Sequence, residues 1–138
     1  MARTAEVYLV PGFLGFVELG ELDYYLGVAP VLGKALAAHG IEATIHATAT
    51  VPAGTIRQRA AKLAHEIAKR TDGRDDTLVH LVGHSTGGLD LRLLLSPESS
   101  LVPGGRLHDT MSADDYARSS AALERVRTAV GVAAPFYG

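Results

Sequence analysis

Residues 81–88 read LVGHSTGG, where an apolar run gives way to three glycines around one serine, Ser85. Glycines this close together cost backbone entropy and weaken any helix or strand that contains them. A folded domain accepts that cost where the backbone must adopt a conformation that other residues avoid, or where another group comes close to it. The feature therefore predicts a tight turn between a buried strand and a helix, with Ser85 in the turn.

The segments on either side of this turn alternate between strand-like and helix-like patterns. Strand-like runs cover residues 5–10, 41–49, 77–82 and 127–135. Helix-like runs cover residues 30–40, those after Thr55, 87–95 and 112–126. This order predicts an α/β fold, in which a parallel sheet has helices on both faces. The run 41–49 alternates strictly between apolar and polar residues, so it should lie near an edge of the sheet.

Local signals predict where several of these elements begin and end. Proline is favoured at the first helical position, so Pro30 should begin a helix that Gly40 follows. Thr55 and Gln58 have the spacing of a capping box, which predicts the start of an amphipathic surface helix. The run 77–82 is apolar on both faces apart from one histidine, so it should be a central strand and the most buried one.

The composition is that of an ordinary globular chain. Of 138 residues, 47% are hydrophobic and 20% are charged, with a formal net charge of −2, so we expect a single domain over residues 1–138. Near-neutral charge gives no electrostatic reason to expect nucleic acid or an anionic membrane surface as a partner. The absence of cysteine excludes disulfides and thiolate metal sites. No run has the length of a membrane span or the form of a signal peptide, so a cytoplasmic protein is expected.

The pentapeptide Gly83–His84–Ser85–Thr86–Gly87 has the pattern G-x-S-x-G, which is typical of a nucleophile elbow. Reactive groups of α/β sheets lie beyond the carboxyl ends of the strands, where Ser85 falls. Flanking glycines let strand and helix cross closely, so the serine can be held in a strained turn. The amide of Thr86 would then face a developing oxyanion from a helix N-terminus. A glycine-rich turn with an incidental serine is the weaker interpretation, because a strand precedes the motif and a helix follows it.

A second feature supports this interpretation independently. The sequence VYLVPGFLG places a strand before a glycine-rich loop, where the other oxyanion donor should come from. Together, YLVPGFLGF, LVGHSTGGLDLRLLLSP and RTAVGVAAPFYG resemble the lipase and esterase branch of the α/β-hydrolase superfamily. The resemblance implies Ser85 as the nucleophile and the backbone amides of Phe13 and Thr86 as the oxyanion hole. Pro11 stands where family members usually have histidine, a departure that leaves the backbone donors unaffected.

The resemblance also implies the reaction, which is hydrolysis of carboxylic esters by acyl transfer through the serine. The substrate it implies is a small-molecule acyl ester, such as a lipid or another hydrophobic ester, and it implies no cofactor. No spacing of histidines and carboxylates suggests a metal site.

A serine hydroxyl needs a base within hydrogen-bonding reach and a third group that orients the base. In the family, the acid and the histidine follow the serine on loops after later strands. This sequence ends at Gly138, shortly after the strand that follows the elbow helix, so a domain truncated before the C-terminal strands is expected. Within the chain, His108 and Asp109 form the pair that could reach Ser85 from a long loop, as base and acid.

The other titratable residues have plainer interpretations. His84 should point away from the working face of the nucleophile, and His80 should be a satisfied histidine of the core or near the surface. Asp90 and Arg92 should form a local polar pair on the helix after the serine. The remaining histidines should lie on solvated faces: His39, His46 and His65.

Residues 127–135 should leave an apolar parallel edge, which is prone to pair with another chain. A homodimer, or a complementing C-terminal half that docks on this edge, is therefore expected. Two alternative functions stay open beside the esterase. One is a non-catalytic binding or interaction module that acts through the edge, and the other is an acyltransferase or thioesterase that uses Ser85.

Overall fold

A computed structural model of the protein describes residues 3–12, 21–49, 51, 53–96 and 107–137. Within these residues, four strands form one sheet in the order β2-β1-β3-β4, and every neighbouring pair is parallel. The strands are β1 (Arg3–Val10), β2 (Ile41–Ala47), β3 (Leu78–His84) and β4 (Val126–Val132). The helices are α1 (Glu21–Ala38), α2 (Ile56–Thr71), α3 (Gly87–Leu95), α4 (Ala113–Leu123) and the short 3₁₀ turn η1 (Leu107–Thr110).

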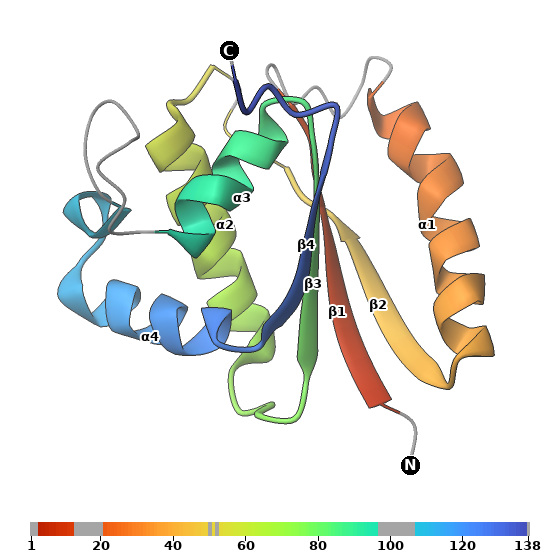
Figure 1. Ribbon diagram of the computed structural model, residues 1–138. Coiled ribbons are helices and arrows are strands. Elements are labelled where there is room, and N and C mark those ends of the chain that lie inside the picture. The colour runs from red at the N-terminus through yellow and green to blue at the C-terminus, as the bar shows by residue number, and fades with distance from the viewer. Residues whose placement is uncertain (1–2, 13–20, 50, 52, 97–106, 138) are drawn as a thin grey trace.

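The helices lie on both faces of the sheet (Figure 1). Helix α1 covers one face, and α2, α3 and α4 lie on the other. The carboxyl ends of the four strands meet at one edge, which is the top of the sheet in Figure 1. This architecture confirms the predicted α/β fold with a parallel sheet and helices on both faces.

The most buried strand is β1, and the expectation that residues 77–82 would be is wrong. Every residue from Ala5 to Val10 is buried, whereas burial alternates along β3. Strand β1 lies between β2 and β3 and has helices over both faces. Because α1 packs over the β1–β2 half of the sheet, His80 and Val82 on the corresponding face of β3 remain only partly buried.

Helix α1 begins at Glu21, so the predicted start near Pro30 is wrong. Pro30 lies inside the helix, where it lacks the amide proton that would bond one turn back. Its side chain is exposed, while Leu32 and Leu36 on the other side of the helix pack against the buried Val7 and Leu9 cluster. Tertiary packing of this apolar face therefore outweighs the local signal. Gly40 follows the helix with a φ of +72°, as predicted.

Helix α2 has the predicted capping box. Thr55 Oγ1 accepts a hydrogen bond from the Gln58 amide at 3.2 Å, and Gln58 Oε1 accepts one from the Thr55 amide at 2.9 Å. The apolar residues Leu63 and Ile67 are buried in the cluster between α2 and the sheet. The helix is therefore amphipathic and begins where the sequence predicts.

Strand β4 pairs with β3 on one side, and its other side forms an open edge of the sheet in the described part of the chain. The predicted last strand is confirmed, although it ends at Val132 and not at residue 135. Strand β2 forms the other edge, as its alternating pattern predicts. In the part of the chain that the structure describes, we find no helix with the length and apolar character needed to cross a membrane.

Candidate active site

Ser85 occupies the turn between β3 and α3, at the carboxyl edge of the sheet (Figure 1). Its φ is +53°, a left-handed conformation that is uncommon for a residue with a side chain. The Ser85 amide donates to the Val132 carbonyl at 2.9 Å, and the Ser85 carbonyl accepts from the Gly88 amide at 3.0 Å. Backbone hydrogen bonds from β4 and α3 therefore hold this strained residue in place.

The glycines on either side of the serine are required by close backbone contacts. A Cβ atom at Gly83 would lie 2.7 Å from the carbonyl carbon of Gly87, and one at Gly87 would lie 2.5 Å from the Val10 carbonyl oxygen. Both distances are shorter than non-bonded atoms tolerate. Strand β3, helix α3 and the end of β1 can meet here only because these two positions lack side chains. The cluster of glycines in the sequence thus has the physical reason that the pattern predicted.

The segment after β1 lies beside the serine. A Cβ atom at Gly12 would be 2.8 Å from Ser85 Cβ and 3.2 Å from Ser85 Oγ. The Pro–Gly pair is therefore next to the hydroxyl, on the side from which the sequence predicts the second oxyanion donor. Phe13, whose amide was that predicted donor, lies outside the described residues.

Thr86 is the N-cap residue of α3, directly after the serine. Its side chain makes no capping hydrogen bond, and its Oγ1 atom is buried without a partner among the described residues. The free backbone amides at this end of the helix form the positive end of the helix dipole. An oxyanion near Ser85 would therefore meet a favourable electrostatic environment from α3.

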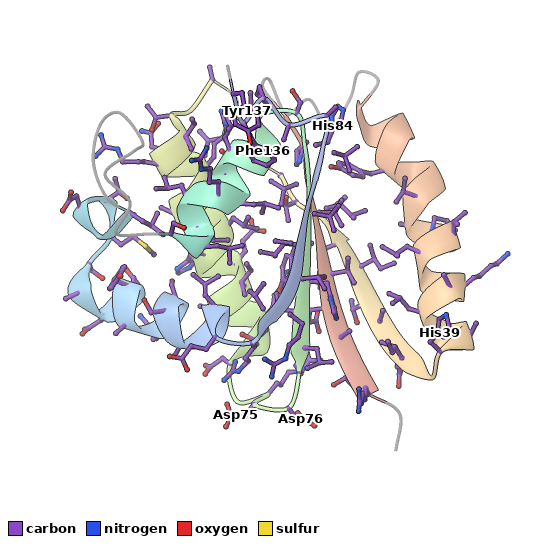
Figure 2. The ribbon with its side chains drawn as sticks, in the orientation of Figure 1. His39, Asp75, Asp76, His84, Phe136 and Tyr137 are labelled. Carbon is purple, nitrogen blue, oxygen red and sulfur yellow. The ribbon has the colours of Figure 1, made fainter. Side chains whose placement is uncertain are left out.

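No hydrogen bond between described residues joins Ser85 Oγ to a histidine. His84 lies at the same end of the sheet as the serine, and His39 lies at the opposite end (Figure 2). The side chain of His108 is outside the described part of the chain, and Asp109 is exposed in η1. The roles predicted for His108 and Asp109 therefore stay predictions.

His80 is a structural residue of the sheet. Its Nδ1 lies 2.8 Å from Thr128 Oγ1 on β4, and its Nε2 is buried without a partner among the described residues. Burial lowers the pKa of His80, so the neutral ring is favoured. This agrees only in part with the prediction of a satisfied histidine, because one of the two ring nitrogens lacks a partner.

The sequence did not predict a polar cluster on β1 and β2. Glu6 is 2% exposed and contacts His46 Nε2 with one carboxylate oxygen and Arg74 Nη1 at 2.6 Å with the other. The rings of His46 and Tyr8 lie 5.0 Å apart. The expectation that His46 is solvated is therefore wrong, because the parallel register places Tyr8 opposite His46 and brings Glu6 close to it. The sequence signal for this polar cluster was the carboxylate of Glu6 inside the apolar run of β1.

The expected pair of Asp90 and Arg92 is also wrong. Asp90 on α3 is fully buried and accepts hydrogen bonds from Arg59 on α2, from Nε at 3.0 and 3.1 Å and from Nη2 at 2.8 Å. Desolvation raises the pKa of Asp90 to about 6, although Arg59 opposes the shift. The sequence carried a signal, since Arg59 precedes Leu63 by one helical turn and so lies on the apolar face of α2.

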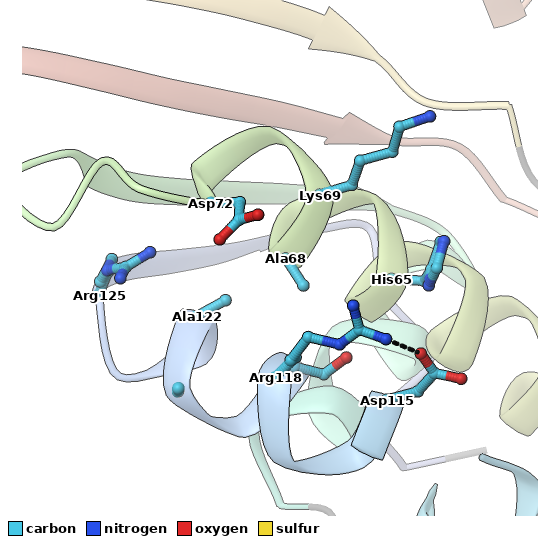
Figure 3. Close-up of a pocket in the computed structure, with 10 residues that line it drawn as sticks. His65, Ala68, Lys69, Asp72, Asp115, Arg118, Ala122 and Arg125 are labelled. Atoms are coloured by element: carbon cyan, nitrogen blue, oxygen red, sulfur yellow. Dashed lines mark hydrogen bonds and ion pairs between the residues drawn. The ribbon is translucent and has the colours of Figure 1, made fainter. Parts of the chain in front are cut away.

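A concavity lies between α2 and α4 (Figure 3). It has a volume of about 360 Å³, and its walls carry both signs of charge, with Arg118 paired to Asp115 at 3.0 Å. Asp72 and Arg125 lie at its other end, next to the amino ends of β3 and β4. The concavity is thus at the end of the sheet away from Ser85. Within the described ranges, no group of three or more histidine and carboxylate side chains could hold a metal ion.

No protein-family model matches the chain, and no curated protein matches it in sequence. Among solved structures, an acetyl xylan esterase, described as an iodinated complex, superposes with a TM-score of 0.60 at 17% identity. The match covers 99% of this chain and 65% of that esterase, so the chain spans just under two thirds of its neighbour's length. The shared fold is of the α/β-hydrolase type. This confirms the fold that the sequence motifs implied, whereas the lipase and esterase branch stays a proposal.

Proposed function

We propose that this chain belongs to a serine hydrolase that cleaves carboxylic esters with Ser85 as the nucleophile. The observation that carries the proposal is the φ of +53° at Ser85, in a strand-to-helix turn that the neighbouring glycines make possible. The substrate we propose is a small-molecule acyl ester with an apolar acyl group, on the strength of the family resemblance. The neighbouring esterase supports ester chemistry at the level of the shared fold.

In the proposed reaction, Ser85 Oγ attacks the ester carbonyl and passes its proton to a base. The negative charge that develops on the carbonyl oxygen is stabilised by the amides of Thr86 and Phe13. The base then gives this proton to the leaving alkoxide oxygen, and loss of the alcohol leaves an acyl-serine, which water hydrolyses to release the acid and regenerate the hydroxyl. His108, oriented by Asp109, is the base that we propose within this chain.

Labelling with a fluorophosphonate probe tests this proposal. We expect the wild-type chain to be labelled and Ser85→Ala to remain unlabelled. Ser120→Ala on α4 is the matched control and should be labelled like the wild type. A folded wild-type chain that takes up no label would contradict the proposal, and labelling that survives in His108→Ala would exclude His108 as the base. With p-nitrophenyl esters, a rate that rises from acetate to longer acyl groups would support the apolar substrate.

The open edge of β4 favours a second candidate function, a binding or interaction module. Val130 on this edge is 49% exposed and Phe136 is 41% exposed, beside an apolar hollow of about 190 Å³ between α3 and β4. Arg127 is the one charged residue of β4, and no charged residue occurs from Thr128 to Tyr137, so most of this edge lacks the charges that usually prevent strand pairing. Light scattering tests this function: self-association that Val130→Lys abolishes would support it, and a monodisperse wild-type monomer would count against pairing between copies.

A further inference from the structure

The ion pair of Arg59 and Asp90 is buried, and hydrogen bonds of α3 link it to the turn that contains Ser85. Arg59 is 5% exposed and Asp90 is 0% exposed, so neither charge reaches bulk water. Replacing such a pair with apolar residues of similar volume is often neutral or stabilising, because desolvation of two charges offsets their attraction. Stability alone therefore gives this pair no clear reason to be ionic.

One end of the pair is joined to the serine turn through the backbone of α3. The Asp90 amide donates to the Thr86 carbonyl at 3.2 Å, and the Gly88 amide donates to the Ser85 carbonyl at 3.0 Å. Asp90 thus belongs to the helical turn that begins directly after the serine. A shift of its side chain would move the first turn of α3, which supplies the Thr86 amide.

The other end of the pair is joined to the segment between β2 and α2. Arg59 Nη1 donates to the Gly54 carbonyl at 3.1 Å. The Gly54 amide in turn donates to the Val51 carbonyl at 3.0 Å, and the neighbouring Ala53 has a strained φ of +56°. The segment follows the carboxyl end of β2, and therefore lies at the same edge of the sheet as Ser85.

Only a guanidinium can make all of these contacts at once. It offers five N–H donors in a planar fork, so Nε and Nη2 can hold Asp90 while Nη1 holds Gly54. An apolar pair could fill the same space, but it could not donate to the Gly54 carbonyl. The ionic pair is thus a connection between two segments that both border the Ser85 edge.

We infer that Arg59 and Asp90 are positioning residues, which hold the Ser85 turn and residues 53–55 at a fixed distance from each other. The inference rests on the proposed function insofar as the positioned group is the nucleophile. Neither residue takes part in bond making. Their effect reaches the ester through the first turn of α3 and through the segment after β2.

The test uses the full chain and the double variant Arg59→Met/Asp90→Leu, which replaces both ions with apolar side chains and removes the hydrogen bond to Gly54. We expect the melting temperature to be unchanged or higher. Hydrogen exchange at the Gly54, Gly88 and Asp90 amides should be about tenfold faster, and fluorophosphonate labelling of Ser85 about tenfold slower. Arg125→Met is the matched control, because Arg125 also joins a carboxylate and a backbone carbonyl, but at the other end of the sheet.

Each outcome decides a separate point. Wild-type rates of exchange and labelling in a folded double variant would overturn the inference. If hydrogen exchange is faster in the double variant but the wild-type chain takes up no label, the positioning role is supported and the proposed function is contradicted. If the double variant does not fold, Arg59→Lys replaces it, because lysine keeps the charge near Asp90 and cannot also hold Gly54. Exchange at Gly54 that stays at the wild-type rate in Arg59→Lys would then overturn the inference.

Discussion

Two carboxylates are buried in the part of the chain that the structure describes, and they are partnered in different ways. Asp90 lies between two helices, and its partner Arg59 is nearly as buried as Asp90 itself. Glu6 lies on a central strand, and its partners reach solvent, since the side chain of Arg74 is 45% exposed and that of His46 is 15% exposed. The first pair is closed to water on all sides, whereas the second is a buried acceptor with partly hydrated donors.

This difference predicts which single substitutions will be strongly destabilising. Removing Arg59 would leave a carboxylate that water cannot reach, and removing one partner of a buried pair is costly for that reason. Arg74 and His46 could each be solvated if Glu6 were neutral, so the second cluster should tolerate single changes better. Substitutions in the two clusters test this contrast.

Arg59→Met should have the largest effect. It leaves Asp90 buried without a cation, so we expect the free energy of unfolding to fall by about 3–5 kcal/mol at pH 8. Stability should partly return on acidification, because a protonated Asp90 no longer carries the buried charge. Urea unfolding at pH 8 and at an acidic pH measures the loss of stability and its recovery. The double variant Arg59→Met/Asp90→Leu is the control and should recover stability, and a loss below about 1 kcal/mol in the single variant would contradict the closed-pair description.

Asp90 should also make stability depend on pH. Its pKa is raised from 3.8 to about 6 in the folded protein, so the folded chain holds this proton more tightly than the unfolded chain does. The stability due to this group is complete below pH 3.8 and is lost as the pH rises through 6. Relative to Asp90→Asn, the wild-type free energy of unfolding should therefore fall by about 2 kcal/mol between pH 4 and pH 7. Parallel curves for the two proteins would refute the raised pKa.

Glu6→Gln should lower the free energy of unfolding by about 1–2 kcal/mol, less than Arg59→Met does, because both partners of Glu6 can turn toward water. Thermal unfolding of the two variants side by side measures the difference. Asp75→Asn, which removes the exposed carboxylate paired with Arg125, serves as the surface control and should cost well under about 1 kcal/mol. A cost for Glu6→Gln as large as that of Arg59→Met would mean that both clusters are equally closed.

The smallest effect is expected from Tyr8→Phe. Tyr8 is 0% exposed, and its hydroxyl has no hydrogen-bond partner in the described part of the chain. Phenylalanine keeps the ring contact with His46 and removes a desolvated hydroxyl, so stability should be unchanged or rise by up to about 1 kcal/mol. Tyr25→Phe is the matched control, since it removes a hydroxyl that donates to the Val10 carbonyl at 2.9 Å, and it should be destabilising. A loss in Tyr8→Phe equal to that in Tyr25→Phe would show that the Tyr8 hydroxyl has a partner in solution.

Much of the fold could be predicted because its signals are local. The capping box at Thr55, the left-handed Gly40 and the turn around Ser85 each depend on residues within a few positions of one another. Where a local signal competed with packing, packing prevailed. Pro30 indicated a helix start, yet α1 extends back to Glu21 because its apolar face packs against β1 and β2.

The polar partners could not be predicted in the same way. Arg59 and Asp90 are separated by 31 positions, and Glu6 and Arg74 by 68, so no sequence spacing relates them. Asp90 had a nearer candidate in Arg92, but Arg92 is exposed and lies away from the direction in which Asp90 is buried. The partners in these ion pairs depend on how the helices and strands are arranged in space.

The alternation of strands and helices and the turn that presents Ser85 follow from the amino-acid sequence alone, because glycine permits both a strained turn and the contact of Gly87 with β1. Which strand is most buried, and which partners the buried carboxylates bind, became clear from the three-dimensional arrangement of the elements. The two kinds of interaction act over different distances along the chain. Backbone preferences act over a few residues, whereas burial and ion pairing depend on elements that come together only when the whole sheet has formed.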